Sequence, residues 1–303
     1  MSVATVTNVR IPIPPVRLGD EIVALAGEYA QGVRTPVEPR DAATVLLLRP
    51  GSDAGSASGP EVYLLRRQLT MGFAAGMAVF PGGGVDVRDA ELPDSCWAGP
   101  SAGEWARRLG VDESRARALV AAAVRETFEE SGVLLAGASG DSVVDDVSGD
   151  DWEADRAALE SRSLSLTELL TRRGLVLRTD LLAPWAAWTT PVFEPKRFAT
   201  WFFVARLPEG QVTRDVSSES SSVLWLSTAE AVAQVEAGEL AMMPPTYLNC
   251  LEVTSFGSED EVLAVAAERV LTMFTPAVTE VDGGHTLSMM PLHASLVAGR
   301  KHS

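Results

Sequence analysis

Hydrophobic positions along the chain follow two different periods. Runs of alternating or continuous apolar residues predict strands, whereas apolar residues that recur every three or four positions predict helices. The strands are expected at 42–48, 61–66, 77–80, 182–190, 198–206 and 223–226, with another beginning at 133–135. The helices are expected at 20–29, 102–109, 115–131, 152–160, 166–173, 228–236, 245–253 and 260–274, with Ser165 and Thr228 as N-caps of two of them. This alternation predicts an α/β fold with a mixed sheet between layers of helices.

The predicted helix at 115–131 carries the most informative polar pattern. Residues 125–133 read R-E-T-F-E-E-S-G-V, so that Glu126, Glu129 and Glu130 share one helix face. Carboxylates in the last helical turn oppose the helix dipole and repel one another. A divalent cation would remove both penalties, and an all-oxygen site suits Mg²⁺ or Mn²⁺. We expect the opposite face to be buried and the carboxylates to lie on the open face; the alternative is a solvated charged face with an Arg125–Glu129 pair.

A glycine-rich segment lies upstream of this helix. A short apolar strand end runs through Phe80 and Pro81 into Gly82, Gly83 and Gly84. Glycines permit close approach of the backbone to a ligand. A glycine cluster alone is usually an ordinary turn, but before a carboxylate helix it predicts a loop that positions a phosphate or a metal.

Together these two segments resemble the box of the Nudix hydrolases, G-x5-E-x7-R-E-U-x-E-E-x-G-U. Gly83 matches the first glycine, and the stretch from Arg125 to Val133 matches the second half. The first box glutamate falls at Asp89, and Thr127 stands where the box prefers an aliphatic residue. The stretch before Arg125 is longer than the box allows, which implies an insertion at about 89–115.

An interrupted box is similar to that of the peroxisomal acyl-coenzyme A diphosphatases. The resemblance extends over about residues 40–255. It includes Gly72-Phe73 with Gly76 and Val79-Phe80, Trp188 to Pro191, Arg197-Phe198 with Thr200 and Phe202-Phe203, Glu219 with Trp225, and Pro244-Pro245. The resemblance implies the Nudix α/β/α sandwich with extra C-terminal helices. We therefore expect an N-terminal arm and short helix at 1–39, the Nudix domain at 40–255, and a C-terminal extension packing on it at 256–303.

The resemblance also implies roles for single residues. Glu126, Glu129 and Glu130 are the expected metal ligands for Mg²⁺ or Mn²⁺, and one of them, Glu126 first, is an alternative general base. Arg125 is expected to orient a neighbouring glutamate. Glu219 matches a glutamate that the family carries on a late loop and is a candidate base or ligand, against a plain surface residue. The phosphate-binding candidates are Gly82, Gly83, Gly84, Lys196 and Arg197.

Composition narrows the class of partner. The chain has 303 residues and a formal net charge of −16, which argues against nucleic acid or an anionic membrane as a partner. Two cysteines imply no disulfide framework, and three histidines, all near the C-terminus, argue against a histidine-built zinc or triad site. No apolar run is long enough to span a membrane, and no signal sequence is visible. A cytoplasmic enzyme is expected, with a homodimer left open.

These observations predict metal-dependent hydrolysis of a diphosphate bond in a nucleoside diphosphate linked to another group. The favoured substrate is coenzyme A or acyl-coenzyme A. The alternatives are an ADP-ribose or NADH pyrophosphatase, and a Nudix-like regulator that binds a nucleotide without turnover. Trp185, Trp188 and Trp201 are expected in the core or a pocket wall rather than as base-stacking platforms.

Overall fold

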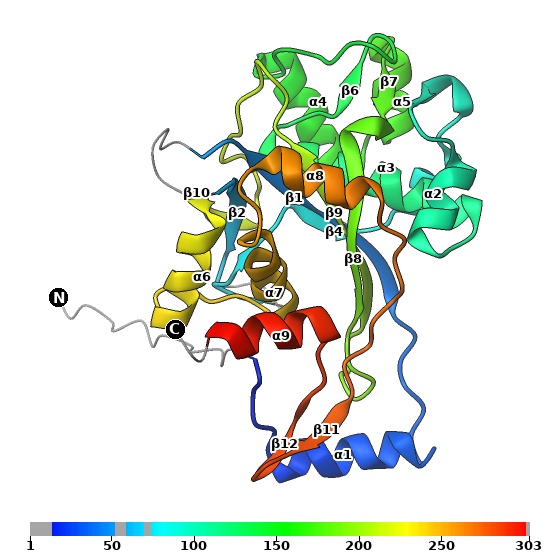
Figure 1. Cartoon of the computed structure of the whole chain (residues 1–303). Coiled ribbons are helices and arrows are strands. Elements are labelled where there is room, and N and C mark those ends of the chain that lie inside the picture. The colour runs from blue at the N-terminus through cyan, green and yellow to red at the C-terminus, as the bar shows by residue number, and fades with distance from the viewer. Residues whose placement is uncertain (1–13, 52–58, 70–73, 301–303) are drawn as a thin grey trace, which may run out of the picture.

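The structure is a computed structural model that describes residues 14–51, 59–69 and 74–300 (Figure 1). Most of the predicted N-terminal arm, and the Gly72-Phe73 pair of the family resemblance, lie outside these ranges.

A mixed sheet occupies the centre of the molecule (Figure 1). Its strands follow the order β10-β2-β1-β9-β8, with β3 paired to β2 and β4 paired to β1. The central pair β1 and β9 is parallel, and the other pairs are antiparallel. The bounds are β1 (Arg40–Arg49), β2 (Glu61–Arg67), β3 (Ala78–Val79), β4 (Gly82–Gly84), β8 (Leu182–Thr189), β9 (Phe198–Arg206) and β10 (Ser220–Ser227). The predicted α/β class with a mixed sheet is confirmed.

Alternation along β1 explains why helices cover both faces of the sheet. Val45 and Leu47 point into a core that contains the long helix α3 (Glu113–Ser131). Leu46 and Leu48 point into a second core on the opposite face. Successive side chains of a strand point to opposite faces, so a strand that is apolar at every position must be buried on both sides. The result is a layer of helices on each face of the sheet.

The second core is closed by helices from the C-terminal third of the chain. They are α6 (Thr228–Ala237), α7 (Pro244–Val253), α8 (Glu259–Ala267) and α9 (Pro291–Arg300). The first face carries α3 together with α2 (Ala102–Leu109), and α4 (Asp150–Glu160) and α5 (Leu166–Arg173) lie beyond them. Ser165 caps α5 as predicted, whereas α6 is capped by Ser227 rather than by Thr228, which is its first helical residue.

The stretch between the glycine strand β4 and α3 is folded. It forms two 3₁₀ turns, η1 (Val87–Glu91) and η2 (Asp94–Cys96), followed by β5 (Trp97–Ala98) and α2. β5 joins a small separate sheet with β6 (Ala136–Gly137) and β7 (Val176–Arg178), which is followed by a third 3₁₀ turn, η3 (Thr179–Leu181). The strand predicted to begin at 133–135 is absent; this stretch is buried irregular backbone and β6 begins only at Ala136. There the side-chain amide of Gln211 makes the two hydrogen bonds that a neighbouring strand would make. It accepts from the N–H of Leu134 and donates to the carbonyl of the same residue.

The helix predicted at 260–274 ends at Ala267. The chain then becomes extended, and Phe274 exchanges two backbone hydrogen bonds with the edge strand β8, donating to Ala187 and accepting from Thr189. An unpaired sheet edge is a row of unsatisfied backbone groups, and pairing with it outweighs continuation of the helix.

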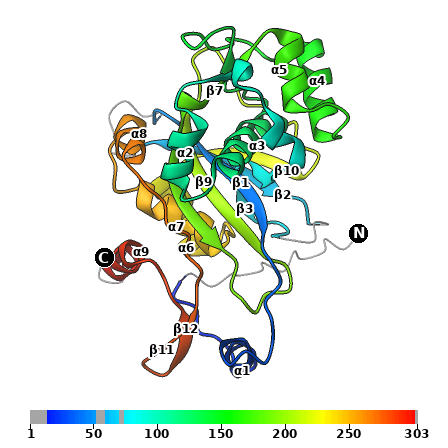
Figure 2. The ribbon, with the colours of Figure 1, turned by 90° about the vertical axis from the view of Figure 1, so that its right-hand side faces the viewer.

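A small appendage projects from the body (Figure 2). It consists of α1 (Asp20–Ala30) and a hairpin of β11 (Val278–Val281) and β12 (Gly284–Leu287). The helix was predicted from the sequence, whereas the hairpin was not. No residue of α1 is fully buried. Among the described residues, no helix is both long and apolar enough to cross a membrane.

Candidate functional site

The glycine strand and the carboxylate helix meet, as predicted. The backbone N–H of Gly82 donates to Glu130 Oε2 at 2.7 Å. A Cβ atom added at Gly83 would lie 2.6 Å from Glu126 Oε2. Only glycine therefore allows this close approach between strand and carboxylate. The loop and the helix form one site although the sequence separates them widely.

Arg125 is the centre of the polar contacts in this site. Its Nη1 donates to Glu126 Oε1 at 2.7 Å and to Glu129 Oε1 at 3.2 Å. Its Nη2 donates to the backbone carbonyl of Gly84 at 2.9 Å. The guanidinium thus links the glycine strand to two of the three glutamates and orients them.

Asp89, in the 3₁₀ turn η1 between β4 and α3, completes this arrangement. Its carboxylate, 3% exposed, accepts hydrogen bonds from Nε and Nη2 of Arg125. It also accepts from the backbone N–H of Asp86 in a reciprocal capping box that fixes η1. In sequence Asp89 is a weak match to the first box glutamate, yet in space it contacts the box arginine directly.

All three glutamates are shielded from solvent, so the predicted open face is wrong for Glu129 and Glu130. Each is 7% exposed. Burial, and then the charge of Glu126, raise the pKa of Glu129 to about 7. The same two causes raise the pKa of Glu130 well above its usual value. Burial also raises the pKa of Glu126 in spite of Arg125 beside it. The protein's own cations therefore do not balance this negative charge.

This excess of buried negative charge fits a divalent cation. The donor set is three carboxylates, the oxygen ligands that Mg²⁺ and Mn²⁺ prefer. Within the described ranges, no three acidic, histidine or cysteine side chains are already arranged as a metal cage. Glu126 and Glu129 turn toward Arg125, and Glu130 turns toward Gly82. The residues fit the ion in chemistry and charge, and their side chains must reorient to hold it.

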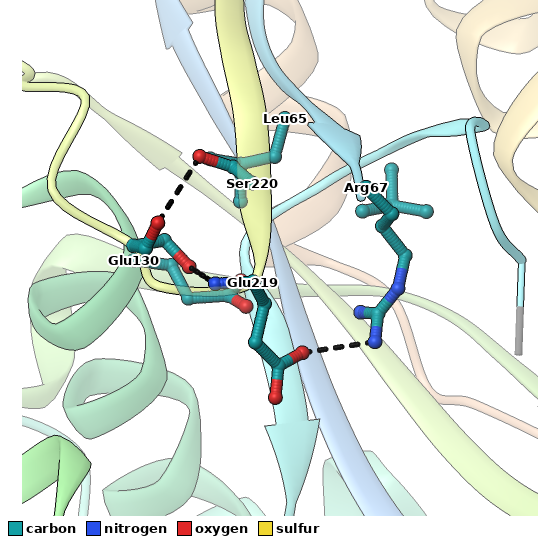
Figure 3. Close-up of a pocket in the computed structure, with 7 residues that line it drawn as sticks. Leu65, Arg67, Glu130, Glu219 and Ser220 are labelled. Atoms are coloured by element: carbon teal, nitrogen blue, oxygen red, sulfur yellow. Dashed lines mark hydrogen bonds and ion pairs between the residues drawn. The ribbon is translucent and has the colours of Figure 1, made fainter. Parts of the chain in front are cut away.

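Glu219 lies beside this cluster. It directly precedes β10, whose first residue, Ser220, pairs with Arg67 at the end of β2. Its Oε2 accepts from Nη2 of Arg67 at 2.9 Å, and Figure 3 shows the two side chains pointing at one another. Its charge contributes to the raised pKa values of Glu126 and Glu130. The two residues border the same pocket as Leu65, Val79, Glu130, Ser217 and Ser220.

Sequence reasoning did not single out Arg67. The alternation of β2 contains the signal, because Leu65 and Arg67 share a strand face and Leu65 packs in the core that contains α3. A charge at the end of a core-facing row is unusual, since buried positions rarely carry arginine.

The two predicted cations at the start of β9 differ in their surroundings. Lys196 is exposed. Arg197 is 9% exposed, and its Nε and Nη1 donate to the carbonyls of Thr190 and Val37. Two of its three nitrogens therefore already hold neighbouring backbone.

The other candidate groups lie in the core. Trp185, Trp188 and Trp201 are each less than 5% exposed. Both cysteines, Cys96 and Cys250, are buried free thiols. The tryptophans act as core side chains here, in line with the first of the two expectations.

Comparison with known proteins agrees with this geometry. The family model of the NUDT19 Nudix domain matches residues 106–252. The acyl-coenzyme A diphosphatase NUDT19 of Gallus gallus is 27% identical over 276 residues, covering 77% of this chain and 72% of its own length. A putative nudix hydrolase 7 of Caenorhabditis elegans is 29% identical over 189 residues, covering 61% of this chain and 52% of its own.

A solved structure supports the same assignment. The Nudix hydrolase from Alicyclobacillus acidocaldarius superposes with a TM-score of 0.65 and 26% identity, over 75% of this chain and 96% of that chain. The chain is therefore identified as a Nudix hydrolase that is similar to the NUDT19-like family.

Proposed function

We propose that this protein is a metal-dependent diphosphatase that hydrolyses coenzyme A or acyl-coenzyme A. The observation that carries the proposal is the buried cluster of Glu126, Glu129 and Glu130 against the glycine strand, in a chain similar to an acyl-coenzyme A diphosphatase. A binder without turnover has no need to keep three like charges buried together, because each costs free energy there.

The four charged residues at the centre of the site have two proposed roles, metal binding and orientation of the metal ligands. Glu126, Glu129 and Glu130 would hold Mg²⁺ or Mn²⁺, which when bound neutralises charge on the phosphoryl oxygens and activates water. Arg125, fixed by Asp89, sets the orientation of Glu126 and Glu129.

The loop and strand residues bring the substrate to this cluster. We propose that the backbone of Gly82, Gly83 and Gly84 positions the diphosphate, because it already lies against Glu126 and Glu130. Glu219 is the proposed extra base or ligand, supported by its electrostatic influence on Glu126 and Glu130.

Coenzyme A differs from ADP-ribose in its 3′-phosphate, which requires a cation. Lys196 and Arg197 stay predictions for this contact, and the exposed Lys196 has the freer side chain. A cytoplasmic location and a homodimer also stay predictions, as does the division of the chain at residues 40 and 255.

The test is a substrate panel with Mn²⁺ and mass spectrometry of the products. Coenzyme A and its acyl derivatives should yield 3′,5′-ADP and 4′-phosphopantetheine or its acyl form. Faster turnover of ADP-ribose or NADH than of any coenzyme A species would show that the preferred substrate is one of these nucleotides and not coenzyme A. Absence of turnover on the whole panel, with binding retained, would instead support a regulator.

A further inference from the structure

The ion pair between Arg67 and Glu219 has no role in the reaction proposed above. Glu219 Oε2 accepts from Arg67 Nη2 at 2.9 Å, so a carboxylate that borders the same pocket as Glu130 is held by a cation. A base or ligand is of no use while it is paired in this way. The pair therefore describes a resting arrangement of the site.

The backbones of both residues are fixed. The carbonyl of Glu219 accepts from the N–H of Gln68, and the side chain of Gln68 donates to the carbonyls on either side, Ser218 and Ser220. Arg67 is held by two backbone hydrogen bonds, to Met77 and from Gly76. Only the two side chains are free to move relative to one another.

The side chains of Glu219 and Arg67 differ in their exposure to solvent. The side chain of Glu219 is 49% exposed, whereas that of Arg67 is 17% exposed. The buried Nε of Arg67 has no hydrogen-bond partner among the described residues. A half-exposed carboxylate can turn at small cost, and a cation with an unused buried donor has capacity for a further anion.

The carboxylate cluster lies within electrostatic reach of both side chains. Arg67 lowers the pKa of Glu130, while Glu219 raises it. Glu219 is thus repelled by the cluster while the cluster is negative, and it would be attracted once a divalent cation lies there.

We propose that Arg67 is the diphosphate-binding residue of this site and that Glu219 occupies it until substrate arrives. The proposal rests on the proposed diphosphatase function. A substrate diphosphate displaces the Glu219 carboxylate from the guanidinium, and the released side chain turns toward Glu126 and Glu130. Arg67 thereby couples arrival of the substrate to completion of the catalytic cluster. No bond is made or broken in this exchange.

The exchange is tested by binding of ADP to the metal-free enzyme in EDTA, measured by isothermal titration calorimetry. ADP carries a diphosphate whichever nucleotide derivative is the substrate. Because no turnover is involved, the result is independent of the substrate panel. Glu219 competes with the ligand, so Glu219→Ala should tighten ADP binding by about twofold to fivefold, the range of a partly exposed ion pair. Arg67→Ala should weaken it by about tenfold.

The double variant gives the decisive comparison. If Glu219 acts through Arg67, Glu219→Ala should have no effect in the Arg67→Ala background. The same tightening in both backgrounds would overturn the proposal, because loss of any negative charge would then suffice. Unchanged ADP affinity in Arg67→Ala would also overturn it.

Matched controls are available on the same elements. Asp215 is an exposed acid in the same loop that accepts from Ser220, so Asp215→Asn removes one negative charge without touching Arg67. Arg66 precedes Arg67 and points to the opposite face of β2, so Arg66→Ala removes a positive charge there. Both should leave ADP affinity unchanged, and an effect equal to that of the test variants would count against the proposal. Arg67→Met, which keeps the apolar stem, replaces Arg67→Ala if that variant fails to fold.

Discussion

Asp89 accepts hydrogen bonds from two nitrogens of the Arg125 guanidinium, from Nε at 3.0 Å and from Nη2 at 2.9 Å. The two residues belong to halves of the box that are far apart in sequence. Their contact holds η1 against α3, and it leaves Nη1 of Arg125 available for Glu126 and Glu129.

Asp89→Ala should destabilise the protein by about 1–3 kcal/mol, because Nε and Nη2 of Arg125 lose a buried carboxylate acceptor while Glu126 and Glu129 still balance the charge of the guanidinium. Turnover should fall as well, since Glu126 and Glu129 lose their fixed orientation. Thermal melting and steady-state kinetics measure the two effects. Asp94 pairs with Arg117 at the surface with its side chain 90% exposed, so Asp94→Asn is the matched control and should change neither. Equal effects of both variants would show that the Asp89 contact has no special role.

Glu129→Gln and Glu130→Gln should each reduce turnover by about 10²–10³-fold, as loss of one preorganised electrostatic contact does. EDTA should abolish wild-type turnover and Mn²⁺ should restore it. Both glutamates are buried among like charges, so the neutral variants should be at least as stable as wild type without metal. Melting in EDTA and kinetics with Mn²⁺ give both values, and wild-type activity in EDTA would contradict the metal assignment.

Gly83→Ala should abolish turnover, because its Cβ would lie 2.6 Å from the carboxylate of Glu126 and one of them must move. Gly27 lies in α1, where an added Cβ meets nothing within 4 Å. Gly27→Ala is therefore the control and should stabilise the chain by about 0.5–1 kcal/mol without altering kinetics. A Gly83→Ala enzyme with normal kcat would mean that this close approach is not required.

The 3′-phosphate contact is tested at the start of β9. Lys196→Ala and Arg197→Ala should each raise KM for coenzyme A more than for dephospho-coenzyme A, which lacks that phosphate. Arg197→Ala should also lower the melting temperature, because the carbonyls of Thr190 and Val37 lose their donor. If KM rises equally for both substrates, neither residue binds the 3′-phosphate.

The C-terminal helices provide a prediction about acid stability. Glu252, 4% exposed, accepts from His293 and Arg269. Burial alone would raise its pKa, but the His293 hydrogen bond and the Arg269 charge outweigh burial and hold the pKa below its usual value. The carboxylate therefore stabilises the fold above the unfolded-state pKa of about 4.3, and this contribution is lost as the pH falls through the folded-state pKa.

Glu252→Gln should accordingly lower stability near pH 7 by about 1–3 kcal/mol, and the difference from wild type should shrink below about pH 4.3. Urea melts across the pH range measure this directly. Glu268 is exposed, so Glu268→Gln is the control and should show no such pH dependence. A difference that stays constant down to pH 3 would exclude the ionised carboxylate as its source.

Sequence reasoning predicted which residues come together where their arrangement follows from local spacing. The glutamates, Arg125 and the glycines all lie together, because helix periodicity and a tight glycine strand are properties of short segments. It misjudged the exposure of Glu129 and Glu130, since burial depends on distant elements such as α4, whose Arg156 donates to the carbonyl of Glu129.

The other differences between the sequence-based predictions and the structure also arise from contacts between segments that are distant in sequence. Arg67 was missed because its partner Glu219 follows it by more than half the chain, and no local pattern joins them. The helix predicted at 260–274 was too long because the edge of β8, which captures Phe274, is invisible from the segment itself. Local propensity is overridden where a distant sheet edge offers backbone partners.

The parallel pairing of β1 with β9 has a consequence for biosynthesis. β1 is buried on both faces, and one of the three strands that pair with it, β9, is completed only when Arg206 has left the ribosome. At about 5–20 residues per second, the edge of β1 that pairs with β9 therefore stays unpaired in the nascent chain for on the order of ten seconds. During this interval the segment Val45–Leu48 is a target for chaperones and for mispairing with other nascent chains. We therefore expect the yield of active enzyme in a cell to depend on protection of β1 during translation as well as on the stability of the finished fold.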